Sequence, residues 1–206
     1  MTLSRAKVLD AALALADAEG LPSLSMRKLA AELGVEAMSL YNHVANKGDL
    51  LDGLAARVFE SVELPDPALP WEERLRALGT GAAAAFAAHP AAIRAMAAGE
   101  ANPRSPGALR LIDAFLSALL DAGLDERGAA KTYRTLIGLL FGSALRDTVD
   151  VAKSPKRTEQ VDDWFRRVVT EDELPSLYRA LPALMDASCA PEFADELGLL
   201  IENLKR

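Results

Sequence analysis

The chain has 206 residues, of which 50% are hydrophobic and only 5% aromatic, and its formal net charge is −7. Alanine and leucine dominate while β-branched residues are sparse, which favours helices over sheets. The acidic balance argues against non-specific binding of nucleic acid by the whole surface, and no run of about 18 uncharged apolar residues predicts a membrane span.

The cellular context is expected to be the cytoplasm. The N-terminus lacks the charged region, apolar core and cleavage site of a signal peptide. Cys189 is the single cysteine, so no intrachain disulfide can form, and we expect an inert buried thiol.

Four helices are predicted at the N-terminus, over residues 4–19, 25–32, 36–43 and 47–62. Ser25 and Asn46 stand where a side chain can cap a helix start, and Gly20 and Gly34 stand where a helix ends. The tight turn at Gly34 separates two short helices, and the second has small polar residues on its outer face. This pattern predicts a helix-turn-helix that presents its second helix to a DNA major groove.

The proline-rich segment 64–70 (LPDPALP) predicts a boundary between a DNA-binding domain, residues 1–63, and a second domain, residues 64–206. Apolar spacing in the second domain also predicts helices, and the expected fold class is therefore all-α. The predicted helices span 71–88, a short stretch around Ile93 and Met96, 106–122, 126–149, 161–169, 173–187 and a last helix opened by Pro191. Pro182 is expected to break the helix at 173–187. Gly138 and Gly142 predict the close approach of another backbone.

Residues 33–55, LGVEAMSLYNHVANKGDLLDGLA, carry the motif G-V-x-x-x-x-L-Y-x-H-V-x-x-K-x-x-L-L. This segment resembles the DNA-binding part of the TetR family of transcriptional regulators, and the resemblance extends over residues 5–62. It implies a homodimer that binds a palindromic double-stranded DNA operator, with repression as the family default. It also implies a C-terminal helical bundle for dimerisation and for a small-molecule effector, with the fourth helix as the mechanical link.

The resemblance also assigns roles to individual residues. Arg27 matches an arginine that reads a guanine, and its alternatives are a phosphate contact or a solvated surface position. Tyr41 matches a phosphate contact, and packing against the first helix is an alternative that is compatible with it. Ala37, Met38 and Asn42 depart from the residues of the family's namesake repressor, so the operator should differ. The predicted DNA-binding residues are Arg5, Ser25, Arg27, Lys28, Ala37, Met38, Ser39, Tyr41, Asn42, His43 and Lys47.

Charge in the first sixty residues is unfavourable for DNA, with six cations against eight anions. Five of the six cations lie at or near predicted helix starts, where helix N-termini already favour phosphate. DNA binding must therefore come from the placement of charge, and a steep salt dependence is expected.

The second domain is expected to enclose an apolar pocket for a small lipophilic effector. For each lining residue taken singly, however, plain core is the favoured interpretation, because any helical bundle needs an apolar stripe. The candidate lining residues are Phe86, His89, Ile93, Met96, Asn102, Ile112, Phe115, Tyr133, Arg134, Ile137 and Phe141. His43 and His89 are the only histidines, so a tetracycline–magnesium effector is not expected, nor is any metal or cofactor. A constitutive regulator without an effector is the alternative function.

The helix at 126–149 and the last helix carry more apolar surface than the core of one protomer can bury. An isologous dimer would cover the remaining surface. The predicted interface residues are Leu139, Gly142, Leu145, Phe193, Leu197, Leu200, Ile201 and Leu204. An enzyme is excluded because the chain has no glycine-rich loop, no G-x-S-x-G motif and no clustered nucleophile and base.

Overall fold

The computed structural model describes residues 3–146, 161–186 and 192–205, and these residues form helices without any strand. The N-terminal helices are α1 (Arg5–Glu19), α2 (Met26–Leu33), α3 (Ala37–Leu40) and α4 (Lys47–Glu60), with a short 3₁₀ turn, η1 (Leu21–Ser23), after α1. The remaining helices are α5 (Trp71–Ala88), α6 (Pro90–Ala97), α7 (Pro106–Asp121), α8 (Glu126–Arg146), α9 (Val161–Val168), α10 (Pro175–Met185) and α11 (Phe193–Leu204). The predicted all-α fold class is confirmed.

Capping residues begin and end these helices as the sequence predicts. The hydroxyl of Ser25 accepts a hydrogen bond from the backbone N–H of Lys28 at 3.2 Å, and the Asn46 side chain accepts one from Asp49 at 3.0 Å. Gly34 ends α2 with φ of +66°, a left-handed conformation that glycine adopts without a Cβ clash. Side-chain oxygens thus satisfy N–H groups that have no partner within the helix.

Three predictions of element boundaries need comment. The third helix was expected over 36–43, but α3 ends at Leu40, and the next residues form turns with bonds three residues apart, such as His43 N–H to the Leu40 carbonyl at 2.9 Å. Pro182 lies inside α10 and does not break it. The expectations for Cys189, for Pro191 and for residues 147–149 fall outside the described residues.

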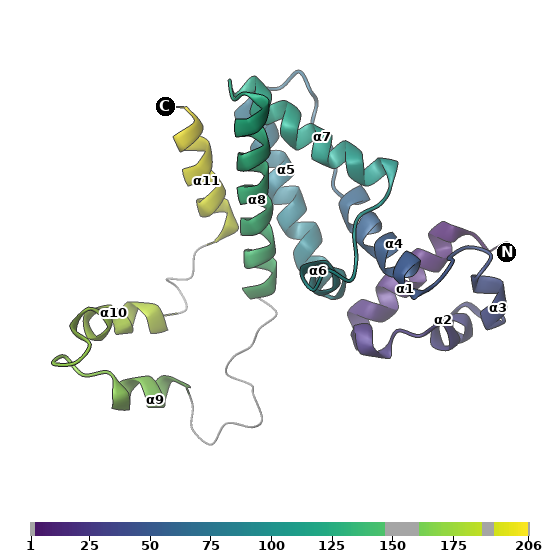
Figure 1. Ribbon diagram of the computed structural model, residues 1–206, viewed down its shortest axis with the longest axis horizontal. Helices are drawn as coiled ribbons and strands as arrows, with labels where there is room; N and C mark the ends of the chain where they lie inside the picture. Colours follow the sequence, from purple (N-terminus) through teal and green to yellow (C-terminus); the bar gives the residue numbers. More distant parts are fainter. Residues whose placement is uncertain (1–2, 147–160, 187–191, 206) are drawn as a thin grey trace.

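The bundle is arranged around α5, which packs against α7, α8 and α11 (Figure 1). Gly79 permits this close packing, because a Cβ at that position would lie 2.6 Å from a methyl of Leu197. Phe193, Leu197 and Ile201 are 7%, 1% and 0% exposed. Their assignment to the dimer interface is therefore corrected: they belong to the protomer's own core, because α11 turns them toward the bundle.

α4 lies between the first three helices and the bundle. It packs against α1 on one side and against α6 and α7 on the other, and Leu54, Ala55 and Val58 are completely buried there. The segment predicted as a boundary lies between α4 and α5, without helix from Ser61 to Pro70. Any movement of α4 must consequently disturb both neighbours.

α9 and α10 project away from the bundle in Figure 1. Within the described residues, no helix has the length and apolarity needed to cross a membrane.

Candidate nucleic-acid interface and regulatory region

The first three helices are held by a small apolar core. Leu29 of α2 and Leu40 of α3 are 0% exposed, and Val44 is 1% exposed. The backbone N–H of Val35 reaches back to the carbonyl of Ala30 at 3.0 Å and closes the turn between α2 and α3. The turn therefore fixes the direction of α3 relative to α2.

The outer side of this unit carries the predicted DNA contacts. Met38 is 72% exposed and Tyr41 is 44% exposed, while Arg27, Asn42 and Lys47 are exposed as well. Ser39, Ala37 and His43 are half-buried, and Ser25 is exposed although its hydroxyl already caps α2. Packing of Tyr41 in the core, the alternative to a phosphate contact, is not what the structure shows. An exposed methionine between polar neighbours offers an apolar surface to a ligand such as a thymine methyl group.

Arg5 is exposed, but its guanidinium is bound by other residues of the same chain. Its guanidinium binds both carboxylate oxygens of Asp49, at 2.7 and 3.0 Å, and donates to the backbone carbonyl of His43 at 2.6 Å. The Asp49 carboxylate also accepts the N–H of Ala45 at 2.8 Å. The side chain of Arg5 thus ties α1 to the turn that follows α3, and its contact with the DNA backbone stays a prediction.

The Arg5–Asp49 pair shifts the ionisation of both groups. The hydrogen bond from Arg5, aided by the N–H of Ala45, lowers the pKa of the Asp49 carboxyl below its ordinary value. The same bond raises the pKa of Arg5. Both groups are consequently charged near neutral pH, and the tie between α1 and α4 is kept.

Ion pairs also redistribute the charge of the N-terminal helices. Lys28 pairs with Glu19, and Arg57 binds Asp10 at 2.6 Å. Among the described residues, Arg27 and Lys47 make no hydrogen bond or ion pair and remain available to a ligand. Pairing leaves the net charge of these helices unchanged, but it occupies Arg5, Lys28 and Arg57 and leaves Arg27 and Lys47 on the outer side at helix starts.

The predicted effector region holds packed aromatic rings. Phe86, Ile93 and Phe115 are at most 1% exposed. The ring of Phe86 lies 5.6 Å from that of Phe59 and 5.5 Å from that of Phe141, between centroids. Such tilted pairs are a favourable arrangement for aromatic side chains in a core. Three further candidates, Met96, Ile112 and Ile137, are half-buried and pack against this core.

Tyr133 is the polar candidate that remains close to this region. Its ring lies 6.1 Å from that of Phe115, and burial raises the pKa of its phenol to about 12. The phenol therefore stays neutral at physiological pH.

The other polar candidates lie elsewhere, which corrects their assignment to the pocket. Nδ1 of His89 is 2.7 Å from a carboxylate oxygen of Asp17, so the imidazole joins α6 to α1. Asn102 and Arg134 are exposed. Apolar periodicity could not indicate that His89 pairs with Asp17 or that Asn102 and Arg134 are exposed.

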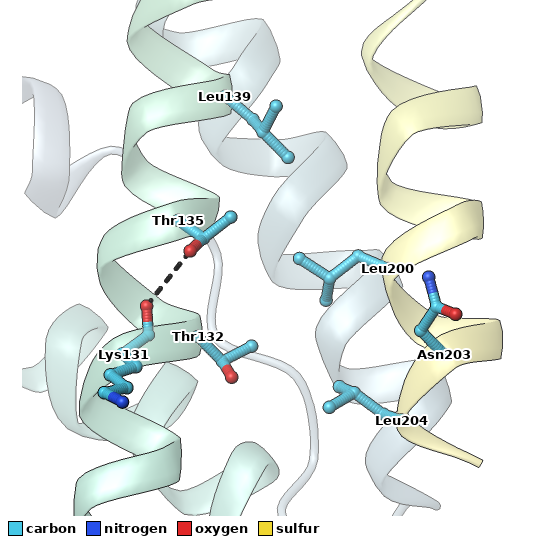
Figure 2. A pocket seen from close by; sticks show the side chains of 7 residues that line it. All are labelled: Lys131, Thr132, Thr135, Leu139, Leu200, Asn203 and Leu204. Atoms are coloured by element: carbon cyan, nitrogen blue, oxygen red, sulfur yellow. Dashed lines mark hydrogen bonds between the residues drawn. The ribbon is translucent and has the colours of Figure 1, made fainter. Parts of the chain in front are cut away.

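A groove of about 420 Å³ runs between α8 and α11 (Figure 2). Leu139 extends from α8, and Leu200 and Leu204 extend from α11, toward the space between the two helices. Gly142 is exposed, Leu145 is half-buried, and neither Gly138 nor Gly142 has a heavy atom of the described chain near the place of a missing Cβ. The close backbone approach expected at the two glycines is therefore absent within the protomer.

Sequence reasoning missed several residues of these regions. Leu199 is 69% exposed on α11, and Lys131, Thr132, Thr135 and Asn203 line the groove. Leu199 lies three or four residues from Asp195, Glu196, Glu202 and Asn203, on the polar face of α11, which was a signal that it faces outward. No sequence signal marked Asp52 and Glu60 of α4, whose carboxylates bond to the segment between α6 and α7.

The geometry is that of a helix-turn-helix unit joined through one helix to a helical bundle, an arrangement suited to a DNA-binding regulator. Two family models match: "Bacterial regulatory proteins, tetR family" over residues 8–54 and "Tetracyclin repressor-like, C-terminal domain" over residues 64–206. The HTH-type transcriptional repressor DrrR1 of Streptomyces coeruleorubidus is 30% identical over 210 residues, which cover 98% of this chain and 76% of the relative. The chain belongs to the TetR family of bacterial transcriptional regulators.

Other relatives are similar over different parts of the chain. The class D tetracycline repressor protein of Escherichia coli is 43% identical over 77 residues, 36% of this chain and 35% of that protein. The crystal structure of ActR from Streptomyces coelicolor in complex with actinorhodin superposes with a TM-score of 0.82 at 26% identity, covering 98% of this chain and 95% of that one. The members of this family are transcription regulators rather than enzymes.

Proposed function

We propose that this protein is a homodimeric repressor that binds a palindromic operator and is released by a small lipophilic effector. The proposal rests mainly on one observation: the helix-turn-helix unit buries its apolar scaffold residues and exposes the residues predicted to contact DNA. Leu29, Leu40 and Val44 are buried, whereas Arg27 and Met38 are exposed where a major groove would be met. Residues 1–63 would form the DNA-binding domain and residues 64–206 the regulatory one, in the cytoplasm where the operator lies.

The groove between α8 and α11 supports the dimer. A second copy placed against it would cover Leu139, Leu200 and Leu204 and the exposed Leu199. Gly138 and Gly142 would then let the partner's helix approach closely, which is a reason for two glycines inside a helix. An isologous contact of this kind places two recognition helices on the two halves of a palindrome.

The effector class is supported by the apolar interior of the bundle and by ActR, a similar structure bound to actinorhodin. A specific observation also favours a second function. The rings of Phe59, Phe86 and Phe141 pack against one another in the region predicted as the pocket. A filled core of this kind suits a constitutive regulator without an effector.

Fluorescence anisotropy with palindromes from the DNA flanking the gene tests the first part of this proposal. We expect a specific duplex to bind at least a thousand times more tightly than a scrambled duplex. Equal affinity for both duplexes would contradict a sequence-specific regulator. A lipophilic compound, with actinorhodin as the first probe, should then raise the melting temperature and release the duplex, whereas the constitutive alternative expects neither effect.

A further inference from the structure

Met38 exposes a thioether on the predicted DNA-reading surface. The residue is 72% exposed, the highest value among the large apolar residues on the surface of the described chain. α3 begins one residue earlier, at Ala37, and Leu40, two residues further on, is 0% exposed. The thioether is therefore carried by a short helix whose opposite side is anchored in the core of the helix-turn-helix.

The backbone that carries this side chain is fixed by hydrogen bonds. The carbonyl of Met38 accepts the N–H of Tyr41 at 3.2 Å, and the N–H of the next residue, Ser39, donates to the carbonyl of Glu36 at 2.9 Å. Ala37 packs against the core. The sulfur of Met38 consequently stays on the outer surface, where both a dissolved oxidant and a DNA base can reach it.

The other methionines of the described chain are less accessible. Met26 in α2 and Met96 in α6 are half-buried and pack against the hydrophobic core, and Met185 at the end of α10 is half-buried as well. A thioether reacts only where the oxidant reaches its sulfur, because the oxygen atom is transferred in direct contact. We therefore expect Met38 to react first among these four residues.

Oxidation converts the side chain from apolar to polar by the transfer of one oxygen atom. A lone pair of the Met38 sulfur attacks one oxygen of hydrogen peroxide, the S–O bond forms as the O–O bond breaks, and the other oxygen leaves with both hydrogens as water. Sulfur is oxidised to the sulfoxide and the peroxide is reduced. The product is a polar, chiral side chain in place of a flexible apolar one, and methionine sulfoxide reductases restore the thioether.

The sulfoxide is poorly matched to the surface that Met38 would meet in the proposed complex. Its oxygen accepts hydrogen bonds but has no hydrogen to donate. The major-groove edge of guanine and the O4 of thymine offer acceptors as well, and the thymine methyl group offers no polar partner. An oxygen buried against these groups loses its water without gaining a hydrogen bond, which weakens the complex. The free protein does not carry this cost, because Met38 is open to solvent there.

We propose that Met38 is a redox-sensitive site, and that its oxidation to the sulfoxide by peroxides weakens operator binding. This inference rests on the proposed function, because the sulfoxide affects regulation only if α3 meets DNA bases. A dimer on a palindrome brings Met38 to both half-sites, so the effect enters twice. The response acts at the DNA-reading surface itself and needs no pocket in the regulatory bundle.

Peptide mass mapping without DNA tests the reactivity of the site. Cys189→Ser protein, which keeps no thiol, is treated with hydrogen peroxide, and samples are digested over time. Sulfoxide should accumulate in the peptide that contains Met38 before it appears at Met26 or Met96. Equal rates at the three residues, in protein that circular dichroism shows to be folded, would overturn the proposal.

Operator affinity in fluorescence anisotropy tests the consequence. We expect oxidation to raise the Kd roughly tenfold or more, because an oxygen without a partner is buried at each half-site. Met38→Leu in the same Cys189→Ser background is the matched variant, since leucine has a similar volume and no sulfur. Its Kd is compared with its own value before the treatment and should not change. A loss in the leucine variant as large as in the protein that keeps Met38 would assign the effect to another residue and overturn the proposal.

Two measurements on the protein that keeps Met38 complete the test without the leucine variant. Bound operator should slow the oxidation of Met38 but not that of Met96, and methionine sulfoxide reductases with a dithiol should restore the original Kd. Oxidation of Met38 that is as fast on the operator as off it, or a Kd that the reductases do not restore, would overturn the proposal. If the reduced protein binds no palindrome, the proposed function fails. If it binds one equally well before and after oxidation of Met38, only this inference fails.

Discussion

At the scale of single residues, the helix-turn-helix keeps its scaffold residues buried and its predicted contact residues exposed. Leu40 and Val44 are buried and hold the fold, whereas Met38 and Asn42 are exposed where base contacts are expected. An apolar Met38 can meet a thymine methyl but cannot donate a hydrogen bond. Sequence preference should therefore depend strongly on Arg27.

Arg27→Ala should weaken operator binding by about 1–3 kcal/mol and relax preference at one base pair in each half-site. The reason is that a guanidinium can bind O6 and N7 of guanine together, and Arg27 has no partner among the described residues that competes for it. Binding to a library of operator variants measures both effects. If the variant weakens all duplexes equally, Arg27 contacts phosphate instead.

Asp49 predicts a pH effect on stability. Its folded pKa is lowered, so the stabilisation is present above its ordinary pKa of 3.8 and is lost as the pH falls through the folded value. Asp49→Asn should cost about 1 kcal/mol near neutral pH, the size of an exposed ion pair with good geometry. Urea unfolding from pH 7 down to pH 3 should show this difference shrinking below pH 4. A difference that stays constant over this range would contradict the ion pair.

At the scale of elements, α8 and α11 carry the surface that distinguishes a monomer from a dimer. Leu200 of α11 lines the groove, while Phe193 and Leu197 on the same helix face the core of the protomer. The apolar stripe on α11 was predictable from the spacing of its residues. Which of these residues face the protomer's own core and which face the groove was not. Burial against α5 depends on how α11 crosses the bundle, which a one-dimensional pattern does not contain.

Leu200→Glu should convert a dimer into a monomer. Each subunit of an isologous dimer contributes one copy of the substitution to the interface, so two unpaired charges would be buried there. Light scattering after size exclusion measures the mass. Leu109→Glu on α7 is the matched control, since Leu109 is 60% exposed and lies away from the groove. A dimer that persists in Leu200→Glu would place the interface elsewhere.

At the scale of the whole molecule, a net charge of −7 has to coexist with binding to a polyanion. Ion pairs such as Lys28 with Glu19 and Arg57 with Asp10 combine opposite charges within the N-terminal helices. Under the proposed function, Arg27 and Lys47 would present positive charge toward DNA, and a dimer would double this number. The remaining acidic surface repels DNA that approaches in any other orientation.

Operator affinity should therefore fall steeply as the salt concentration rises. We expect a decrease of roughly tenfold or more between 50 and 200 mM, as several phosphate contacts would give. Anisotropy titrations at a series of salt concentrations give the slope. Lys47→Ala should reduce that slope by about one per protomer, because one phosphate contact is lost. An affinity that hardly changes over this range would rule out placed charge as the source of binding.

The sequence by itself determined the helices, their caps and the family, because periodicity, N-cap residues and a motif at fixed spacing are local properties of the chain. Only the tertiary structure decided that His89 points to Asp17, that Arg5 is tied to Asp49, and that Phe193 and Leu197 fill the core of the protomer. It also brought Asp52 and Glu60 to the segment between α6 and α7. These contacts join residues about 40 to 120 positions apart, and the direction in which helices cross, rather than the order of residues along them, determines which side chains meet.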